Sequence, residues 1–377
     1  MKNVTIVGVG KMGSAIAWAM DRLGFRVTGV DSSAASAQFL SVLGNKHTFR
    51  LVGRSFLSDK ASLDKLFEGN IYSQMKAPDV VISSLPYHQT EALADYCIEQ
   101  GLRYCDLGGR VDVSSRINKL AKEEATKPVM TDLGLAPGWV NILTEWGCKE
   151  IRRSPEEVKM MVGGLPGIPD NPPLNYAVTW SVDGLINEYK DDCEVLINGE
   201  VIKVPGMEGL ETVYVEKIDE ELEAFYTSGG SSHTTRLMKG RGAKNCSYKT
   251  LRYKGHGEAV KFLIRRCGLN EECLMPIFEK GCVSHHGDIV ILKVEIKSGE
   301  VSWNKEILVP YDENFTAMQK GTAFPISAVA SLMAEGYFDG DKEQHRDYWT
   351  KYPKNLSYSD IPFEEFNKKI KLLGLET

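Results

Sequence analysis

The chain has 377 residues, enough for two domains, because single hydrophobic cores stop growing at roughly 250 to 300 residues. Hydrophobic residues make up 42% of it and charged residues 25%, as in a folded globular protein. A formal net charge of -6 argues against a partner such as nucleic acid or an anionic membrane, both of which require clustered lysine and arginine.

The first third of the chain alternates short strand patterns with helical patterns. Strands are expected at residues 4–7, 26–30, 80–83, 103–107 and 129–132, and helices at 15–23, 62–67, 89–99 and 113–124. Such alternation is typical of βαβ units, whose strands lie parallel. We therefore predict an α/β protein that begins with a Rossmann-type, doubly wound parallel sheet over residues 1–133.

The pattern changes after residue 133. Gly163-Gly164 and the proline-rich segment 165–173 lead into a helical run at 176–189, followed by strand-rich segments at 194–204 and 289–309 and a helix at 257–267. This mixture predicts a second, α+β domain with a mixed sheet over residues 134–321, which would supply the substrate pocket and the oligomer contacts. Helical patterns at 322–334 and 363–372 predict that residues 322–377 return to the first domain.

A glycine motif follows the first expected strand and opens the first expected helix. In that context Gly8 permits a tight turn, Gly10 lets the backbone approach a pyrophosphate, and Gly13 lets helix and strand pack closely. Asp31 ends the second strand, where its carboxylate would accept hydrogen bonds from ribose hydroxyls and repel a 2′-phosphate. These residues predict a site for NAD rather than NADP, formed by Gly8, Gly10, Lys11, Met12, Gly13 and Asp31.

A second loop follows the expected strand at 80–83, at the carboxyl edge where open α/β sheets bind their ligands. Its residues Ser84, Leu85 and Pro86 are predicted to line the cofactor cleft. Tyr87 and His88 come next and are candidates for proton transfer. A histidine at the start of a helix is also commonly a cap or a surface residue.

Five longer strings together resemble the saccharopine dehydrogenase-like family along nearly the whole chain: GVGKMGSA at 8–15, SLPYH at 84–88, CDLGG at 105–109, DLGLAPGWVN at 132–141 and TLRYKGH at 250–256. The strings at 175–189 and 223–230 resemble its L-lysine 6-dehydrogenase branch. This resemblance implies NAD-dependent oxidative deamination of the ε-amine of L-lysine. The product would be 2-aminoadipate 6-semialdehyde, which cyclises to piperideine-6-carboxylate. The resemblance also implies a homo-oligomer, dimeric or larger.

Oxidation of an amine requires a base, because a hydride leaves the carbon only when the amine is neutral, and an alkyl ammonium has a pKa near ~10.4. Asp112 and four other polar residues fall at or after strand ends on the cofactor edge. We predict the catalytic group among those four, which are Tyr87, His88, Asp106 and Asp132. The sequence does not rank them, since aspartate beside glycine also commonly caps a turn.

The far end of a lysine substrate carries a carboxylate and an α-ammonium, which call for a guanidinium and an anionic partner. The resemblance implies that Arg252 binds the substrate carboxylate. Where saccharopine reductases carry arginine in a motif like Trp-Ser-Ser-Arg-Gly, this chain has Asp183, which we predict to bind a free ammonium. His256, which closes the TLRYKGH string, is predicted to orient a carboxylate or join a proton relay, or to be an ordinary loop histidine.

No metal site is expected, because the eight cysteines include no CxxC pair. His285 and His286 lie near Cys282, but adjacent histidines on an expected strand would point to opposite faces. The apolar first twenty residues resemble a secretory signal, yet glycines and Lys11 interrupt them, and no apolar run approaches the ~18 residues of a membrane span. We predict a cytoplasmic protein without a membrane anchor.

Two other functions remain open. One is a saccharopine-type or carboxynorspermidine-type reductase, against which Asp31 and Asp183 count, because such enzymes often prefer NADP and handle an extra carboxylate. The other is a catalytically silent NAD-binding module. Against it count Tyr87, Asp106 and Arg252, which keep the pocket titratable or charged.

Overall fold

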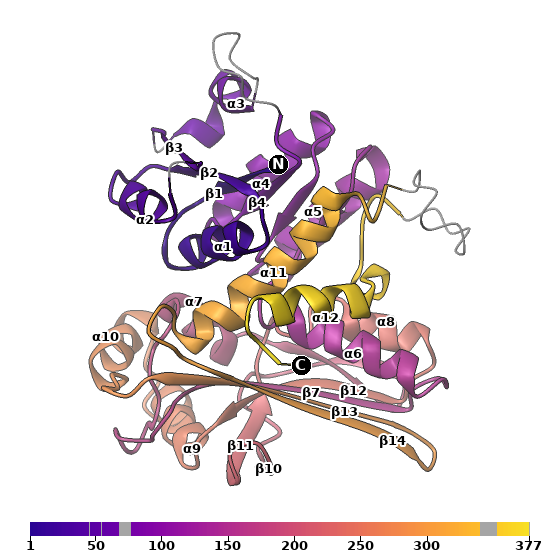
Figure 1. The fold of residues 1–377 in the computed structure, drawn as a ribbon. Helices are drawn as coiled ribbons and strands as arrows, with labels where there is room; N and C mark the ends of the chain where they lie inside the picture. Colours follow the sequence, from indigo (N-terminus) through magenta and orange to yellow (C-terminus); the bar gives the residue numbers. More distant parts are fainter. Residues whose placement is uncertain (45, 54, 68–76, 340–352, 377) are drawn as a thin grey trace. The chain divides into compact units, whose positions relative to one another are not determined.

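The computed structural model describes residues 1–44, 46–53, 55–67, 77–339 and 353–376 (Figure 1). The chain folds into two compact units. The first unit contains Met1–Gly134 together with Thr322–Thr377, and the second contains Leu135–Gly321. None of the helices within the described ranges is long and apolar enough to cross a membrane.

The first unit is built on six parallel strands in the order β3-β2-β1-β4-β5-β6. This order is that of a dinucleotide-binding Rossmann sheet, so the predicted fold of this region is confirmed. The strand β3 lies at one edge and was not predicted, because its residues Thr-Phe-Arg-Leu show no apolar run. The strands are β1 (Asn3–Val7), β2 (Arg26–Asp31), β3 (Thr48–Leu51), β4 (Val80–Ser83), β5 (Tyr104–Asp106) and β6 (Val129–Met130).

Helices connect these strands, as parallel pairing requires. The first of them buries a stripe of small and apolar side chains that includes Ile16 and Met20. The helices of this unit are α1 (Lys11–Arg22), α2 (Ser36–Val42), α3 (Lys60–Phe67), α4 (Tyr87–Glu99), α5 (Val111–Glu124) and α12 (Phe363–Leu372).

The C-terminal segment is tied to the first sheet beside β6. Val129 donates its N–H to the carbonyl of Lys354 at 2.8 Å and accepts the N–H of Leu356 at 2.9 Å. Arg103, just before β5, forms an ion pair with Asp339 at 2.5 Å. Residues separated by more than two hundred positions in sequence therefore share one edge of this sheet.

The second unit is built on a mixed sheet in the order β10-β11-β12-β7-β13-β14, with β8 and β9 joined to it through β12. Strands β12 and β7 are parallel and the other neighbours are antiparallel, which confirms the predicted mixed sheet. Its strands are β7 (Glu157–Pro166), β8 (Cys193–Ile197), β9 (Glu200–Val204), β10 (Glu211–Val215), β11 (Glu220–Tyr226), β12 (Asn245–Arg252), β13 (Asp288–Ser298) and β14 (Val301–Pro310).

In this unit the structure adds one feature that was not predicted and corrects the start of one helix. Gly163 and Gly164 lie inside the central strand β7, where a Cβ on Gly163 would come within 2.9 Å of the Leu251 side chain. Glycine there permits close approach of the neighbouring strand β12. The helix expected at 176–189 begins only at Val182, because Ser181 caps it by accepting the N–H of Gly184.

Helices flank this sheet (Figure 1). One cluster of buried apolar side chains joins the helix that Ser181 caps to the helix at 271–281 and to β11, and its largest members are Tyr189, Phe225 and Phe278. The helices are α6 (Trp139–Glu150), α7 (Val182–Lys190), α8 (Thr234–Gly240), α9 (His256–Lys261), continued by a π-helical turn at 262–266, α10 (Glu271–Gly281) and α11 (Ala317–Glu335), which runs from the second unit into the first.

Candidate functional site

The glycine turn of the first unit places its three glycines in three different environments. Gly8 has φ +90° and lies so close to β4 that a Cβ on it would be 2.7 Å from the Ser84 carbonyl oxygen. A Cβ on Gly13 would be 1.9 Å from the Gly8 carbonyl oxygen, whereas a Cβ on Gly10 would meet no atom within 4 Å. Gly8 and Gly13 are therefore required by packing. Gly10 leaves open space beside the turn, where a side chain would block the approach of a phosphate.

The amino end of α1 adjoins this open space. Its N-cap residue is Gly10, so no side chain caps the first amides of the helix, and its first turn contains no acidic residue. Lys11 is exposed and Met12 is half-buried. Uncapped amides and the positive end of the helix dipole favour an anion, so the turn fits the pyrophosphate of a dinucleotide.

Asp31, at the end of β2, holds the turn against the sheet. Its Oδ2 accepts the N–H of Val9 at 2.7 Å and its Oδ1 accepts the N–H of Ser33 at 2.8 Å. The side chain is half-buried. Each carboxylate oxygen keeps a second lone pair, so Asp31 can still accept hydrogen bonds from ribose hydroxyls.

The loop after β4 lies against the same turn. The N–H of Ser84 donates to the carbonyl of Val7 at 2.8 Å, and Pro86 is the N-cap of α4. Leu85 packs against the buried apolar cluster of this unit. The structure thus brings Ser84 beside Gly8 and Gly13, in agreement with a shared role around one ligand.

Tyr87 and His88 are the first two residues of α4, and both are exposed. The Arg110 guanidinium lies over the Tyr87 ring at 5.6 Å from its centroid. His88 has its ring edge-on to Tyr87 and hydrogen bonds to the Gln89 amide at 3.2 Å. Among the residues described, neither candidate forms a hydrogen bond with a carboxylate that would orient it as a base.

Asp106, at the end of β5, is buried, and both of its carboxylate oxygens accept hydrogen bonds. Its Oδ1 accepts the N–H of Gly108 at 2.8 Å and of Asp132 at 3.1 Å, and its Oδ2 accepts the Tyr104 hydroxyl at 3.0 Å. Burial, reinforced by the nearby Asp132 carboxylate, raises the pKa of Asp106 to about 7. Such a value suits proton exchange at neutral pH, although its hydrogen bonds also serve to hold the turn.

Asp132 follows β6 with φ +61°, and its Oδ1 accepts the Ser114 hydroxyl at 2.6 Å. Its carbonyl accepts the Tyr358 hydroxyl at 2.9 Å, so it also anchors the C-terminal segment. Asp112 is exposed in the first turn of α5, and the hydrogen-bonded Arg110 guanidinium lowers the pKa of its carboxyl. The three aspartates thus occupy very different environments.

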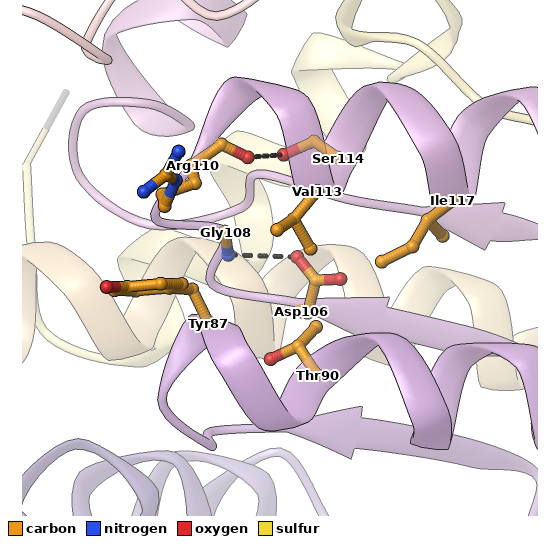
Figure 2. Close-up of a pocket in the computed structure, with 8 residues that line it drawn as sticks. All are labelled: Tyr87, Thr90, Asp106, Gly108, Arg110, Val113, Ser114 and Ile117. Carbon is orange, nitrogen blue, oxygen red and sulfur yellow. Dashed lines mark hydrogen bonds between the residues drawn. The ribbon is translucent and has the colours of Figure 1, made fainter.

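A small pocket opens between α4 and α5 (Figure 2). Tyr87 and Arg110 face each other across one end of it, and the Asp106 carboxyl points into the space between the two helices. His88 and Asp132 are not among its lining residues, which are Tyr87, Thr90, Asp106, Gly108, Arg110, Val113, Ser114 and Ile117.

In the second unit, Arg252 ends β12 and is only 3% exposed. Its Nε donates to the Tyr189 hydroxyl at 2.9 Å, its Nη1 donates to the Leu251 carbonyl at 2.9 Å, and its guanidinium lies 4.5 Å from the centre of the Tyr176 ring. Within the described ranges it forms no ion pair with a carboxylate. A buried cation without an anionic partner is costly unless a ligand supplies the anion.

His256 completes a directed chain of hydrogen bonds. Its Nδ1 lies 2.6 Å from the Leu174 carbonyl, to which it must donate, and its Nε2 lies 3.0 Å from the Tyr189 hydroxyl. Burial and the nearby Arg252 lower the pKa of His256 to about 3, so the imidazole is neutral and Nε2 accepts. Arg252 thus donates to Tyr189, which donates to His256, and this order fixes the position of the guanidinium.

Asp183 lies in the first turn of α7 and is exposed. It forms no hydrogen bond or ion pair with Arg252, so its role as the partner of a substrate ammonium stays a prediction. Glu188 on the same helix is half-buried, and burial raises the pKa of its carboxyl to about 8 although Arg252 lowers it. Sequence reasoning missed Glu188. The signal was its spacing, three residues after the buried Leu185 and therefore on the same face of α7.

The histidine pair near Cys282 does not lie on a strand, contrary to the prediction. His285 and His286 are exposed in the loop that precedes β13, and His286 faces Asp170 at 3.8 Å. The argument from opposite strand faces therefore does not apply to them. In the described part of the chain, no three histidine, cysteine or acidic side chains are grouped in a way that could hold a metal ion.

Comparison with known proteins agrees with this geometry. Residues 4–132 match the model of the saccharopine dehydrogenase NADP binding domain, and residues 134–347 match that of the saccharopine dehydrogenase C-terminal domain. The chain belongs to the saccharopine dehydrogenase family. Membership identifies it as an oxidoreductase of that family and assigns a nicotinamide dinucleotide to residues 4–132 as its class of cofactor.

Two curated relatives illustrate the family. The mitochondrial alpha-aminoadipic semialdehyde synthase of Mus musculus is 28% identical over 223 residues, which are 54% of this chain and 23% of that protein. The saccharopine dehydrogenase [NADP(+), L-glutamate-forming] of Schizosaccharomyces pombe is 25% identical over 226 residues, 57% of this chain and 48% of that protein. The chain thus spans less than half the length of either relative.

A solved structure shows the same fold. The apo saccharopine dehydrogenase (L-Glu forming) of Saccharomyces cerevisiae superposes with a TM-score of 0.71 at 16% identity, covering 98% of this chain and 97% of that one. The glycine turn lies inside the matched NADP binding domain of this chain. Arg252 and its hydrogen-bond chain lie inside the matched C-terminal domain.

Proposed function

We propose that this protein is an NAD-dependent L-lysine 6-dehydrogenase. It would oxidise the ε-amine of lysine to an imine, which water hydrolyses to 2-aminoadipate 6-semialdehyde and ammonia. The observation that carries the proposal is Arg252, a buried guanidinium held in place by Tyr189 and Tyr176 and left without a protein carboxylate among the described residues. A guanidinium held in this way is suited to bind the carboxylate of an amino acid substrate. The strings at 175–189 and 223–230 support lysine as that amino acid.

The cofactor would be held by the glycine turn, by the amino end of α1 and by the Ser84–Pro86 loop, with Asp31 at the adenosine ribose. When bound, its nicotinamide accepts the hydride from the carbon that carries the amine. The Asp31 carboxylate supports NAD, because a 2′-phosphate near it would be repelled. Gly10 supports the same site, because its open side leaves room for the pyrophosphate.

The reaction also requires a group that takes the proton from the ε-ammonium. We keep Tyr87, His88, Asp106 and Asp132 as candidates for this role. Asp106 combines burial with a pKa near 7, which matches a base that works at neutral pH. Tyr87 is the exposed group at the end of the same pocket, in a position to exchange protons with solvent (Figure 2).

We further propose that the protein is a cytoplasmic homo-oligomer. All eight cysteines are free thiols, as is usual in a reducing compartment. The ten-residue strand β14 lies at the edge of the second sheet, and the unpaired N–H and C=O groups of an edge strand can pair with another chain.

A second candidate is a saccharopine-type reductase, which joins or splits an amine and an aldehyde. It is supported by the family models and by the relatives named above. The two functions make opposite demands on the substrate pocket, because saccharopine carries additional carboxylates and lysine carries a free ammonium.

NADH formation separates the two candidates. The purified 377-residue chain should produce NADH with L-lysine and NAD faster than with saccharopine or ornithine, and faster than with lysine and NADP. Production of reduced cofactor with saccharopine but not with lysine would replace the first proposal by the second. Silence with every amino acid would show that the proposed activity is wrong.

A further inference from the structure

The second unit contains a carboxylate and a guanidinium that are both left without an ionic partner. Arg252 uses its Nε and Nη1 in hydrogen bonds, and its Nη2 makes no bond to any described residue. The Glu188 carboxylate likewise has no hydrogen bond or ion pair within the described ranges. A buried guanidinium without an anionic partner and a buried carboxyl without a hydrogen bond are both unfavourable, so two such groups close together call for an explanation.

These two ionisable groups belong to one cluster. Three tyrosines interact electrostatically with both groups. Arg252 lowers and Glu188 raises the pKa of each of Tyr176, Tyr189 and Tyr248. Glu188 immediately precedes Tyr189, whose hydroxyl bonds to Arg252 at 2.9 Å. Nevertheless Glu188 and Arg252 form no ion pair at 4.0 Å or less, so they are neighbours that do not neutralise each other.

A third polar group without a hydrogen-bond partner lies in the segment that follows β11. The Thr227 hydroxyl is buried without a hydrogen-bond partner, in a side chain that is 2% exposed. The next residue, Ser228, donates its N–H to the Glu188 carbonyl at 3.1 Å and thereby fixes this segment beside α7. A guanidinium, an ionisable carboxyl and an unpaired hydroxyl on neighbouring segments indicate a polar ligand that carries charges of both signs.

We propose that Glu188 and Arg252 together bind the zwitterionic head group of an α-amino acid, with the carboxylate on Arg252 and the α-ammonium on Glu188. In an α-amino acid the carboxylate and the ammonium are bonded to the same carbon. The guanidinium and the carboxyl that bind them must therefore lie close together without forming an ion pair with each other. This assignment deepens the proposed lysine dehydrogenase function, on which it rests. It replaces the exposed Asp183 by Glu188 as the partner of the ammonium.

Binding in this manner changes the protonation of Glu188. The titratable groups that interact electrostatically with Glu188 are Arg252, three tyrosines and one thiol: Tyr176, Tyr189, Tyr248 and Cys193. Burial raises the pKa of the Cys193 thiol to about 12 and raises the pKa values of the tyrosines, so these groups stay neutral. With its own pKa near 8, Glu188 holds a proton at pH ~7 in the free protein. When the ammonium binds, the carboxyl ionises and this proton passes to solvent.

The test measures binding by calorimetry on the full-length chain with NADH present, so that no turnover occurs. The three probes are L-lysine, 6-aminohexanoate, which lacks the α-ammonium, and cadaverine, which lacks the carboxylate. Glu188→Gln should weaken lysine binding about tenfold or more, as expected for a lost charge-assisted hydrogen bond, and leave 6-aminohexanoate unchanged. Arg252→Lys should weaken lysine and 6-aminohexanoate together and leave cadaverine unchanged.

Glu188→Gln is a mild change, because glutamine resembles the protonated carboxyl of the free protein, and Glu188→Asp should retain part of the affinity. Asp192→Asn, an exposed acid just beyond the end of α7, is the matched control and should bind every probe as the parent chain does. Measured in buffers of different ionisation enthalpy, lysine should release a proton from the parent chain near pH ~7. It should release none from the Glu188→Gln variant.

Three binding results would overturn the assignment: no binding of any probe, equal loss of lysine and 6-aminohexanoate binding in Glu188→Gln, or a selective loss of lysine binding in Asp183→Asn instead. These outcomes differ from failure of the proposed function. Lysine that binds through Glu188 but yields no NADH refutes the activity and supports the site. Lysine that is oxidised equally well by Glu188→Gln supports the activity and refutes the site.

Discussion

The glycine turn of the first unit and the arginine cluster of the second are built in different ways. In the turn, backbone atoms form the site: Gly8 and Gly13 are needed because neighbouring carbonyls leave no room for a side chain, and Asp31 accepts two backbone amides. In the cluster, side chains form the site, since Arg252, Tyr189 and His256 come from three separate elements and hold one another by hydrogen bonds.

This difference determines how each region should respond to change. A backbone turn tolerates no added atom at its crowded positions but is insensitive to side chains elsewhere. A hydrogen-bonded chain of side chains has room for small changes of shape, but it loses stability when one hydroxyl is removed, because buried donors and acceptors are left unpaired. The following variants test whether the two regions behave in these ways.

The largest effect is expected at Gly13. Alanine there would put a Cβ 1.9 Å from the Gly8 carbonyl oxygen, a backbone atom that cannot move away without opening the turn. We expect Gly13→Ala to lower the free energy of unfolding by about 3 kcal/mol, measured by urea denaturation, and to abolish binding of NADH.

Gly10→Ala is the matched control in the same turn. A Cβ at this position meets nothing within 4 Å, and the backbone φ of -79° is open to any residue. The free energy of unfolding should therefore change by less than about 1 kcal/mol, while NADH binding still weakens because the Cβ occupies the side where the pyrophosphate approaches. Equal stability losses in the two variants would contradict the division of roles between these glycines.

The second effect concerns Tyr189. Replacing it by phenylalanine removes the hydroxyl between Arg252 and His256 and leaves the Nε of one and the Nε2 of the other without a partner. We expect a loss of about 2 kcal/mol in the free energy of unfolding and a higher KM for lysine. Tyr248→Phe is the control for stability, because the Tyr248 hydroxyl makes no hydrogen bond with the described residues. A similar loss in both variants would mean that the hydrogen-bond chain does not stabilise the cluster.

The same contrast explains what the sequence could predict. The strand-turn-helix around Gly8, Gly10 and Gly13 is contiguous, so its pattern predicts both the fold and the place of the cofactor. The alternation of strands and helices in the first third likewise predicts the parallel sheet, although the short edge strand β3 carries too weak a pattern to be found.

The second unit was less predictable because its proposed substrate site is assembled from distant segments. Arg252 and His256 were found through the family resemblance, but their link through Tyr189 depends on how α7 packs against β12. Asp183 was predicted because it changes the sign of a charge in a motif, but it is exposed in the first turn of α7. Glu188 was missed because a single acid in a helical pattern is usually on the solvent side.

The third effect is a dependence of stability on pH that comes from His256. Its pKa is about 3 in the folded chain and ~6.5 when unfolded, so the unfolded chain binds the extra proton between these values. The stabilising contribution is complete above pH ~6.5 and is lost as the pH falls towards 3, by about 1.4 kcal/mol per pH unit. Glu188 and Asp106, whose pKa values are raised to about 8 and about 7, act in the opposite direction.

A comparison with His256→Gln isolates the histidine from these two acids. The variant should be less stable than the parent chain at pH ~7. The difference between their free energies of unfolding should become smaller by about 1.4 kcal/mol for each pH unit below pH ~6.5. Urea denaturation at several pH values measures this gap. A gap that stays constant with pH would show that His256 becomes protonated in the folded chain as readily as in the unfolded one.

The smallest effect is expected in the first unit. There the side chain of Asp31, rather than the backbone, is expected to select between NADH and NADPH. Asp31→Asn removes the charge that repels a 2′-phosphate, and it replaces one of the two oxygens that accept the Val9 and Ser33 amides. The ratio of NADH to NADPH affinity should fall about tenfold, a change of about 1.4 kcal/mol, when both are titrated by fluorescence. Asp31→Glu keeps the charge and should keep the preference for NADH while binding it more weakly. If both variants leave the ratio unchanged, another residue selects between the two cofactors, and the turn then differs from the arginine cluster in having no selective side chain of its own.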